Sequence, residues 1–344
     1  MRAWFSAMLA AMIAVVLALP NIGIAQSTAP ASAAGKAFSQ EQLDQMLAPV
    51  ALYPDALLAQ ILMASTYPLE VVSAARWVKD NPKVTGKALE DAMHKQAWDP
   101  SVKSLAPFPS VLQMMDAKLE WTQQLGDAFL AQRDGVMTTV QGLRKKAYTQ
   151  GNLKSSEQQK IVVEKEIIVI QPATTTVYVP VYNPTIVYGT WWYPAYVPYY
   201  YYPPGYVVRP GVGFTAGIIV GAALWGGVNW RDRDVNININ HYNQFNRTNI
   251  TRANWQHDPA HRKGVAYRDP TIAQKYNRDQ AADAARRDAA RKDMSPGPAR
   301  DAGPAGRPAA RDADRPGAGP RDRPGRDRDD DDGPDKGRSG RDRK

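Results

Sequence analysis

Two histidines, His257 and His261, come closest in type and spacing to a metal site. On a helix, positions four apart can carry their imidazoles on one face, which suits zinc ligands. Asp258 and Pro259 stand between them, and an aspartate followed by proline is also the typical cap and first residue of a helix. No third ligand stands at a recognisable spacing. We therefore expect a helix start with no bound metal or cofactor, and keep the pair as a secondary metal candidate.

Catalytic motifs are missing from the sequence. It has no Gly-x-Ser-x-Gly, Ser-x-x-Lys or His-Glu-x-x-His and no glycine-rich phosphate loop. Carboxylates that could act as an acid–base pair in hydrolysis occur throughout residues 38–150, namely Asp55, Glu70, Glu90, Asp91 and Asp99. Most carboxylates on helices are solvated charges or caps, so we expect no catalytic residues.

Aromatic residues gather in a Tyr/Pro-rich arm, residues 191–210, where prolines disfavour a central strand and favour polyproline II. Flat aromatic faces suit sugar rings or proline-rich partners. The candidate binding aromatics are Trp191, Trp192, Tyr193, Tyr196, Tyr199, Tyr200, Tyr201 and Tyr202. The alternative is that these side chains cover a neighbouring hairpin.

A glycine-rich apolar segment follows at residues 211–228. Gly213, Gly217 and Gly221 are spaced by four, so on a helix they would form a face for close packing, with Trp225 near the end. The segment approaches the roughly 20 residues of a membrane-spanning helix. It predicts membrane contact or homo-oligomer formation, and the alternative is packing on the protein's own helices or a loose loop.

The N-terminus predicts export. Arg2 precedes an apolar run, and Gly23-Ile24-Ala25 offers the small residues of a cleavage site, so residues 1–25 form a signal peptide and 26–37 a linker. The chain has no cysteine and a net charge of +9. We expect a location in the bacterial periplasm or outer envelope. There a basic chain meets a membrane or an anionic envelope polymer rather than nucleic acid.

Residues 38–150 predict one all-α domain. Ser39 and Gln42 form a capping box, and Pro68 and the Asp99-Pro100 pair mark helix starts. Residues 111–148 carry apolar residues at spacings of three and four, with breaks expected at Gly126 or Gly135.

Beyond residue 150 the period becomes that of a strand. Residues 161–170 and 176–188 predict a β-hairpin or small sheet within 151–190. Residues 229–294 hold an Asn-rich strand beginning at Val235 and a basic helical stretch, and 295–344 predict a disordered Arg/Asp/Pro/Gly tail. The fold class is therefore α+β.

Several segments resemble a known family. They are Leu47-Ala-Pro-Val-Ala-Leu-Tyr-Pro-Asp, Val111-Leu-Gln-Met-Met-Asp, Trp121-Thr-Gln-Gln-Leu-Gly-Asp and Val177-Tyr-Val-Pro-Val-Tyr-Asn-Pro. They are similar to exported bacterial proteins of the family known only as domain of unknown function 3300. The resemblance implies export and supports the domain limits, and it carries over no catalytic residue.

These features together predict a non-enzymatic cell-envelope protein that acts by binding or association at the membrane or wall. The alternative is a cell-wall hydrolase with a carboxylate pair in the helical domain. A deep cleft with two facing carboxylates would favour the hydrolase.

Overall fold

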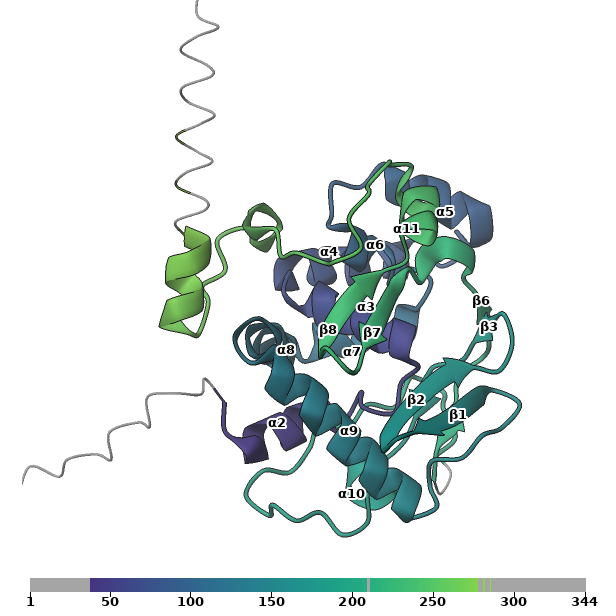
Figure 1. Ribbon diagram of the computed structural model, residues 1–344. Helices are drawn as coiled ribbons and strands as arrows, with labels where there is room; N and C mark the ends of the chain where they lie inside the picture. Colours follow the sequence, from purple (N-terminus) through teal and green to yellow (C-terminus); the bar gives the residue numbers. More distant parts are fainter. Residues whose placement is uncertain (1–37, 209–210, 278–280, 282–284, 286–344) are drawn as a thin grey trace, which may run out of the picture. The chain divides into compact units, whose positions relative to one another are not determined.

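The computed structural model describes residues 38–208, 211–277, 281 and 285 (Figure 1). The expected signal peptide, linker and C-terminal tail lie outside the described residues. The N-terminal helices are α2 (Gln40–Leu47), α3 (Asp55–Ser65), α4 (Pro68–Asp80), α5 (Gly86–His94), α6 (Pro100–Lys103), α7 (Pro109–Ala117), α8 (Leu119–Ala131) and α9 (Arg133–Thr149).

The later elements alternate short strands and short helices. They are β1 (Gln159–Glu164), β2 (Ile167–Pro172), β3 (Thr176–Val177), β4 (Pro180–Val181), α10 (Pro184–Val187), β5 (Gly213–Phe214), β6 (Ile218–Ile219), the 3-10 helix η2 (Gly221–Ala223), β7 (Gly226–Asn229), β8 (Asp234–Ile237), α11 (Ile239–Asn246) and the 3-10 helix η3 (Pro259–Arg262). The α+β class predicted from the sequence is confirmed.

The predicted helix starts are confirmed. Ser39 accepts a hydrogen bond from the Gln42 backbone and the Gln42 side chain accepts one from the Ser39 backbone, which is a complete capping box. Pro68 is the first residue of α4. Asp99 caps α6 by accepting a hydrogen bond from the Ser101 backbone.

Residues 111–148 form parts of three helices, broken at Lys118 and Gln132, and the breaks expected at Gly126 or Gly135 are wrong. Gly126 lies inside α8. A methyl group on its Cα would come within 2.3 Å of the Ser65 carbonyl oxygen. This glycine therefore serves the close approach of α8 to α3, because only a residue without Cβ fits there.

Helix α3 lies at the centre of the core. Every residue from Leu57 to Ser65 is buried, including the polar Gln60. The helix packs against α8 and α6 on the helical side and against β7 and β2 from the later chain. One apolar core therefore runs across residue 150, where the sequence suggested a domain limit.

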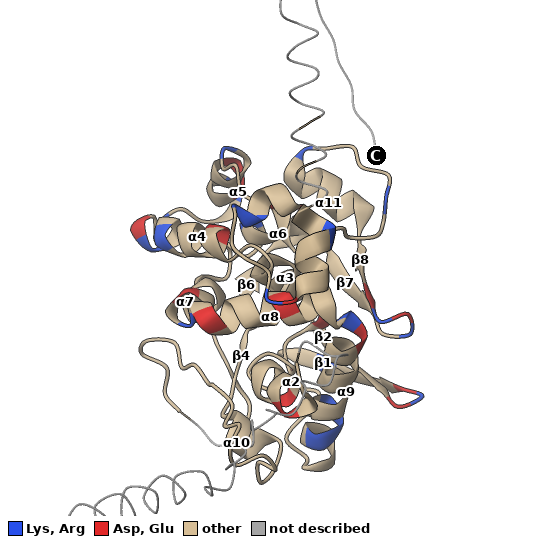
Figure 2. Ribbon diagram, turned by 90° about the vertical axis from the view of Figure 1, so that its left-hand side faces the viewer, with Lys and Arg blue, Asp and Glu red and all other residues tan. Residues whose placement is uncertain are grey.

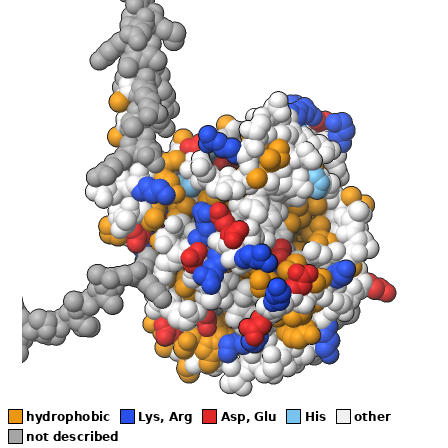
Figure 3. Space-filling view, in the orientation of Figure 1, with side chains coloured by type: hydrophobic (Ala, Val, Ile, Leu, Met, Phe, Trp, Pro, Cys, Tyr) orange, Lys and Arg blue, Asp and Glu red, His pale blue; other side chains and the backbone are white. Residues whose placement is uncertain are grey.

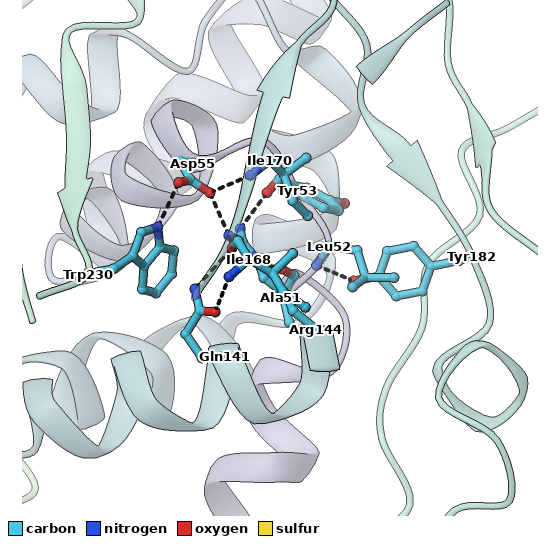
Figure 4. Close-up of polar contacts among 10 residues, drawn as sticks. All are labelled: Ala51, Leu52, Tyr53, Asp55, Gln141, Arg144, Ile168, Ile170, Tyr182 and Trp230. Atoms are coloured by element: carbon cyan, nitrogen blue, oxygen red, sulfur yellow. Dashed lines mark hydrogen bonds and ion pairs between the residues drawn. The ribbon is translucent and has the colours of Figure 1, made fainter. Parts of the chain in front are cut away.

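Arg144 of α9 ties the helices to the strands (Figure 4). Its fully buried guanidinium donates hydrogen bonds to the backbone oxygens of Ala51, Tyr53 and Ile168, and it pairs with Asp55 Oδ1 at 2.6 Å. The other oxygen of the Asp55 carboxylate accepts from Trp230 Nε1 at 2.7 Å. Segments from α3, β2 and the loop after β7 thus meet at one side chain.

The hairpin forms within the first of the two predicted strand runs. Strands β1 and β2 pair antiparallel from Gln159 and Pro172 to Glu164 and Ile167. Lys165 and Glu166 make the turn with φ of 46° and 74°, a left-handed conformation that two-residue hairpin turns require. The second run, residues 176–188, instead supplies β3, β4 and α10.

The glycine-rich segment is not a helix, which corrects the glycine face expected from the spacing. Gly213 starts β5, which pairs with β4, and Gly217 precedes β6, which pairs with β3. A Cβ at Gly217 would lie 2.4 Å from Thr176 Cγ2. Gly221 has a φ of +51° at the start of η2. These glycines allow close approaches and a turn within the chain itself. The alternative expectation was packing on the protein's own helices or a loose loop, whereas Gly213 and Gly217 lie beside the chain's own strands.

Trp225 is a core residue of this segment. Only 1% of its surface is exposed, and its Nε1 donates to Ser104 Oγ at 2.6 Å. Within the described residues no single helix has the length and hydropathy to cross a membrane; α3 and α4 pass that test only as a pair bent by 116°.

The alternation beginning at Val235 does form a strand. β8 pairs antiparallel with β7, and Val235 is fully buried. The asparagine-rich residues that follow form α11, which the sequence did not predict. Asn238 caps this helix by accepting from the His241 backbone. Asparagine at a cap is favoured because its side chain satisfies a free N–H of the first turn.

Candidate functional site

A cleft of about 370 Å³ lies where the end of α9 meets the start of the aromatic arm. Its lining combines positive charge, hydrogen-bonding groups and aromatic rings. The residues are Lys145, Lys146, Thr149, Gln150, Tyr188, Gly189, Thr190 and Trp192. We refer to it as the lysine–tryptophan cleft.

Local sequence explains why the arm crosses the end of α9. Helix α9 ends in a Gln150 cap followed by Gly151 with φ of +71°, the usual helix stop. Asn183 caps α10, after which Gly189 turns the chain with φ of +83°. A Cβ at Gly189 would contact the Gln150 side chain at 3.1 Å. Glycine therefore lets the arm lie directly on the helix end.

Trp192 is held in a fixed orientation at the cleft. Its Nε1 donates to Asp44 Oδ2 at 2.8 Å, a contact between residues far apart in the sequence. Its ring centroid lies 4.3 Å from that of Trp191, whose own Nε1 donates to the Tyr196 carbonyl oxygen. Burial raises the pKa of Asp44, while hydrogen bonds such as that from Trp192 lower it. The Trp192 ring therefore forms the aromatic part of the cleft lining, and Trp191 packs against it.

The cleft carries positive charge. Lys146 Nζ lies 4.0 Å from the centroid of the Trp192 ring, a cation–π geometry. Lys145 is 65% exposed, and its ion pair with Glu166 spans 4.0 Å, the outer limit of such contacts. In Figure 2 the ribbon near α9 carries the blue colour of Lys and Arg positions. Both lysines can therefore meet an anionic group arriving from solvent.

The other aromatics of the arm do not form one continuous row. Tyr199 packs against Trp121 at 6.1 Å, under Lys118, and Tyr201 donates to Gln113 Oε1 at 3.3 Å. Tyr200 and Tyr202 contact each other at 5.4 Å, and Tyr193 lies beside Trp192 at 6.0 Å. The arm therefore contacts several helices, and Trp192 is the arm residue that lines the cleft, with Trp191 and Tyr193 packed beside it.

The histidine pair packs against the helical core, where both rings contact the ring of Tyr67. His257 stacks on Tyr67 with ring centroids 5.1 Å apart, and its ring nitrogens contact Thr66 and Tyr267. Burial lowers the pKa of His257 to about 3, so it is neutral at pH 7. His261 lies in η3, capped by Asp258 as predicted. Among the described residues, no group of three or more histidines and carboxylates is placed to hold a metal ion.

Two of the acidic residues named from the sequence are in contact, through the backbone of one of them. Glu70 is fully buried, and its Oε2 accepts from the Asp99 backbone N–H at 2.6 Å. Its Oε1 contacts His261 Nδ1 at 3.0 Å and Lys263 Nζ at 3.3 Å. Burial raises the pKa of Asp99, which accepts from Ser101. These partners occupy both carboxylates, and neither residue lines the lysine–tryptophan cleft.

Comparison with known proteins assigns the chain to a protein family. A family model described as protein of unknown function (DUF3300) matches residues 39–262. The chain belongs to the DUF3300 family. It is 38% identical over 312 residues to the uncharacterized protein YacH of Escherichia coli (strain K12), covering 70% of this chain. The alignment covers 50% of that relative's length. No solved structure matches.

The family match spans the structural features described above. Residues 39–262 of this DUF3300 chain include the lysine–tryptophan cleft, the Arg144 cluster and both histidines. The last matched residue, Arg262, is 1% exposed and donates to Asp127 and to the Thr66 carbonyl oxygen. The match therefore includes the segment around Arg262, which packs on the helical core.

Sequence reasoning missed the basic half of the DUF3300 cleft. Lys145 and Lys146 stand in the last turns of a helix, where basic residues commonly interact with the helix dipole. Their sequence pattern is explained by the helix dipole alone, so it does not indicate that they lie beside Trp192. The available signal was the Gly151-Asn152 helix stop directly after the basic helix end. It predicts that the chain reverses direction beside these lysines.

Proposed function

We propose that this DUF3300 chain is an exported, non-enzymatic protein of the bacterial cell envelope that binds an anionic polysaccharide polymer through the lysine–tryptophan cleft. The observation that carries the proposal is the position of Lys146 Nζ, 4.0 Å from the Trp192 ring centroid. One site thereby offers a cation for an anionic group and an aromatic ring for the apolar face of a sugar.

The chemistry of the lining supports a sugar ligand. Thr149, Thr190 and Gln150 supply hydroxyl and amide groups that can both donate and accept hydrogen bonds. The Trp192 ring supplies apolar surface for the C–H face of a sugar ring. The cleft volume of about 370 Å³ lies at the small end of typical ligand sites, which suits one or two residues of a polymer.

The location is proposed from the N-terminus. Residues 1–25 have the order of charge, apolar run and small residues that defines an export signal. The net charge of +9 favours anionic partners in the periplasm or outer envelope. Gly213, Gly217 and Gly221 are not part of the proposed binding site. They lie in short strands and turns that pack within the chain itself.

Co-sedimentation with isolated peptidoglycan sacculi tests the proposal, because their free carboxylates make them an anionic glycan. The full chain should bind untreated sacculi, and binding should fall when salt is raised or the carboxylates are amidated. Replacing Lys145 and Lys146 together by glutamine should weaken binding by about tenfold, or about 1.4 kcal/mol. The matched control replaces Lys79 and Lys87, two lysines outside this cleft, and should bind as the wild type does.

Two results would contradict the proposal. Equal binding to native and amidated sacculi would show that charge is not recognised. Release of soluble glycan fragments by the wild type, lost in Glu70→Gln, would instead support the hydrolase alternative.

A further inference from the structure

A second, larger cavity lies on another part of the molecule. Its volume is about 500 Å³, and it is enclosed by the end of α4, helix α5, the chain before α7, the β6–η2 segment and the end of α11. On the face shown in Figure 3, hydrophobic side chains gather below α5 and α11, where β6 lies. An apolar hollow of this size, lined by several secondary-structure elements, is the usual form of a ligand-binding site.

The walls of the cavity are mostly aliphatic. Leu89 and Met93 face it from α5, Val78 from α4, and Ile218 and Val220 from the β6–η2 segment. Leu89, Met93 and Val78 are each 9% exposed or less. Apolar side chains from three separate elements thus line one space without filling it, which is the composition of a site for an apolar ligand.

The cavity also has charged groups in its lining. The lining contains two lysines, Lys79 at the end of α4 and Lys87 in the first turn of α5. It contains one carboxylate, Glu90. Lys87 is 80% exposed and pairs with Asp91 at 3.5 Å. Lys79 is exposed beside the apolar wall. The positive balance favours a ligand whose polar end is an anion.

We propose that this cavity binds a single-chain amphiphile, an acyl chain with an anionic head group such as a long-chain fatty acid. The aliphatic walls take the chain, and Lys79 pairs with the head group. A protein partner is a poorer fit, because stable protein contacts bury about 1,200–2,000 Å² across a broad surface rather than in a single pocket. This inference is independent of the lysine–tryptophan cleft, since the two sites share no lining residue.

Titration of the full chain with hexadecanoate below its micellar concentration tests the proposal, with displacement of a fluorescent polyene fatty acid as the readout. The wild type should bind one equivalent saturably. Val84→Trp places a large ring at a half-buried lining position and should abolish binding. Lys79→Gln should weaken hexadecanoate binding by about tenfold and leave binding of the uncharged hexadecanol unchanged. Lys83→Gln, an exposed lysine outside the lining, is the matched control.

Three outcomes would overturn the proposal. They are absence of saturable binding by the folded wild type, unchanged binding by a folded Val84→Trp variant, and equal effects of Lys79→Gln and Lys83→Gln. Because Lys79 is exposed, its variant remains informative even if Val84→Trp does not fold. Replacing Lys145 and Lys146 should leave hexadecanoate binding unchanged, so failure of one proposal does not decide the other.

Discussion

Arg144 and Asp55 form an ion pair of 2.6 Å in which the arginine side chain is fully buried and the aspartate is 14% exposed. The pair is the meeting point of α9, the start of α3, strand β2 and Trp230. A buried charge is tolerated only when its partner and hydrogen bonds are all in place.

Removing this arginine should destabilise the whole fold. We expect Arg144→Ala to lower the free energy of unfolding by about 3–5 kcal/mol, because Asp55 and three carbonyl oxygens lose their partner. The neighbouring Lys145→Ala removes only an exposed ion pair and should cost less than about 0.5 kcal/mol. Urea unfolding of both variants checks the comparison; equal costs would show that the cluster contributes little.

Two glycines in helices should respond oppositely to the same substitution. Gly126→Ala would place a methyl group 2.3 Å from the Ser65 carbonyl oxygen, so α8 must move away from α3. We expect a loss of about 2 kcal/mol or more. Gly142→Ala, in α9 with no atom within 4 Å of the added carbon, should gain up to about 1 kcal/mol. Thermal melts of both variants measure the signs; a stabilised Gly126→Ala would contradict the close packing.

Acid should destabilise the protein through His257. Burial lowers its pKa from 6.5 to about 3, so between these values the unfolded chain takes up a proton that the folded chain refuses. Its contribution is complete above pH 6.5 and is lost as pH falls toward 3, by on the order of 5 kcal/mol. His257→Gln should flatten this part of the curve of unfolding free energy against pH.

His261 should act in the opposite direction. Its hydrogen bond to Glu70 raises its pKa above 6.5, so the protonated form stabilises the fold. That contribution is complete below pH 6.5 and disappears as pH rises through the folded-state pKa. His261→Gln should therefore lower stability at pH 5.5 more than at pH 8.5. Equal losses at the two values would contradict the ion pair.

Export can be measured directly at the N-terminus. If residues 1–25 are a signal peptide, the protein recovered from the envelope should begin at Gln26. Sequencing of the N-terminus checks the cleavage position. An uncut chain beginning at Met1, or recovery only from the cytoplasm, would contradict the predicted location.

Local signals in the sequence predicted helix ends well. The Ser39 capping box, Pro68, Asp99 and Asp258 were all located correctly, because a cap is a contact between residues two or three positions apart. The break at Gln132 was missed because it depends on a contact between residues far apart in the sequence. Its side chain bonds to the backbone of Phe38 in a distant segment, which no local pattern reveals.

The candidate site depended on distant pairings. The aromatic arm was found from its composition, but the Trp192 contact with Asp44 joins residues separated by 148 positions. The glycine spacing of four suggested a helix because periodicity cannot distinguish a packed helical face from two-residue strands. Strands β3 to β6 are too short to carry a pattern, so their pairing is set by tertiary packing.

Helix α3 lies at the centre of the core, but many of its packing partners come late in the chain. Its covering strand β7 lies more than 160 residues later, and the contacts of Tyr67 with His257 and of Asp127 with Arg262 come later still. A chain delivered N-terminus first, by a ribosome or through a membrane pore, cannot complete its core until residue 262 has emerged. The early helices therefore emerge before the residues that complete their packing.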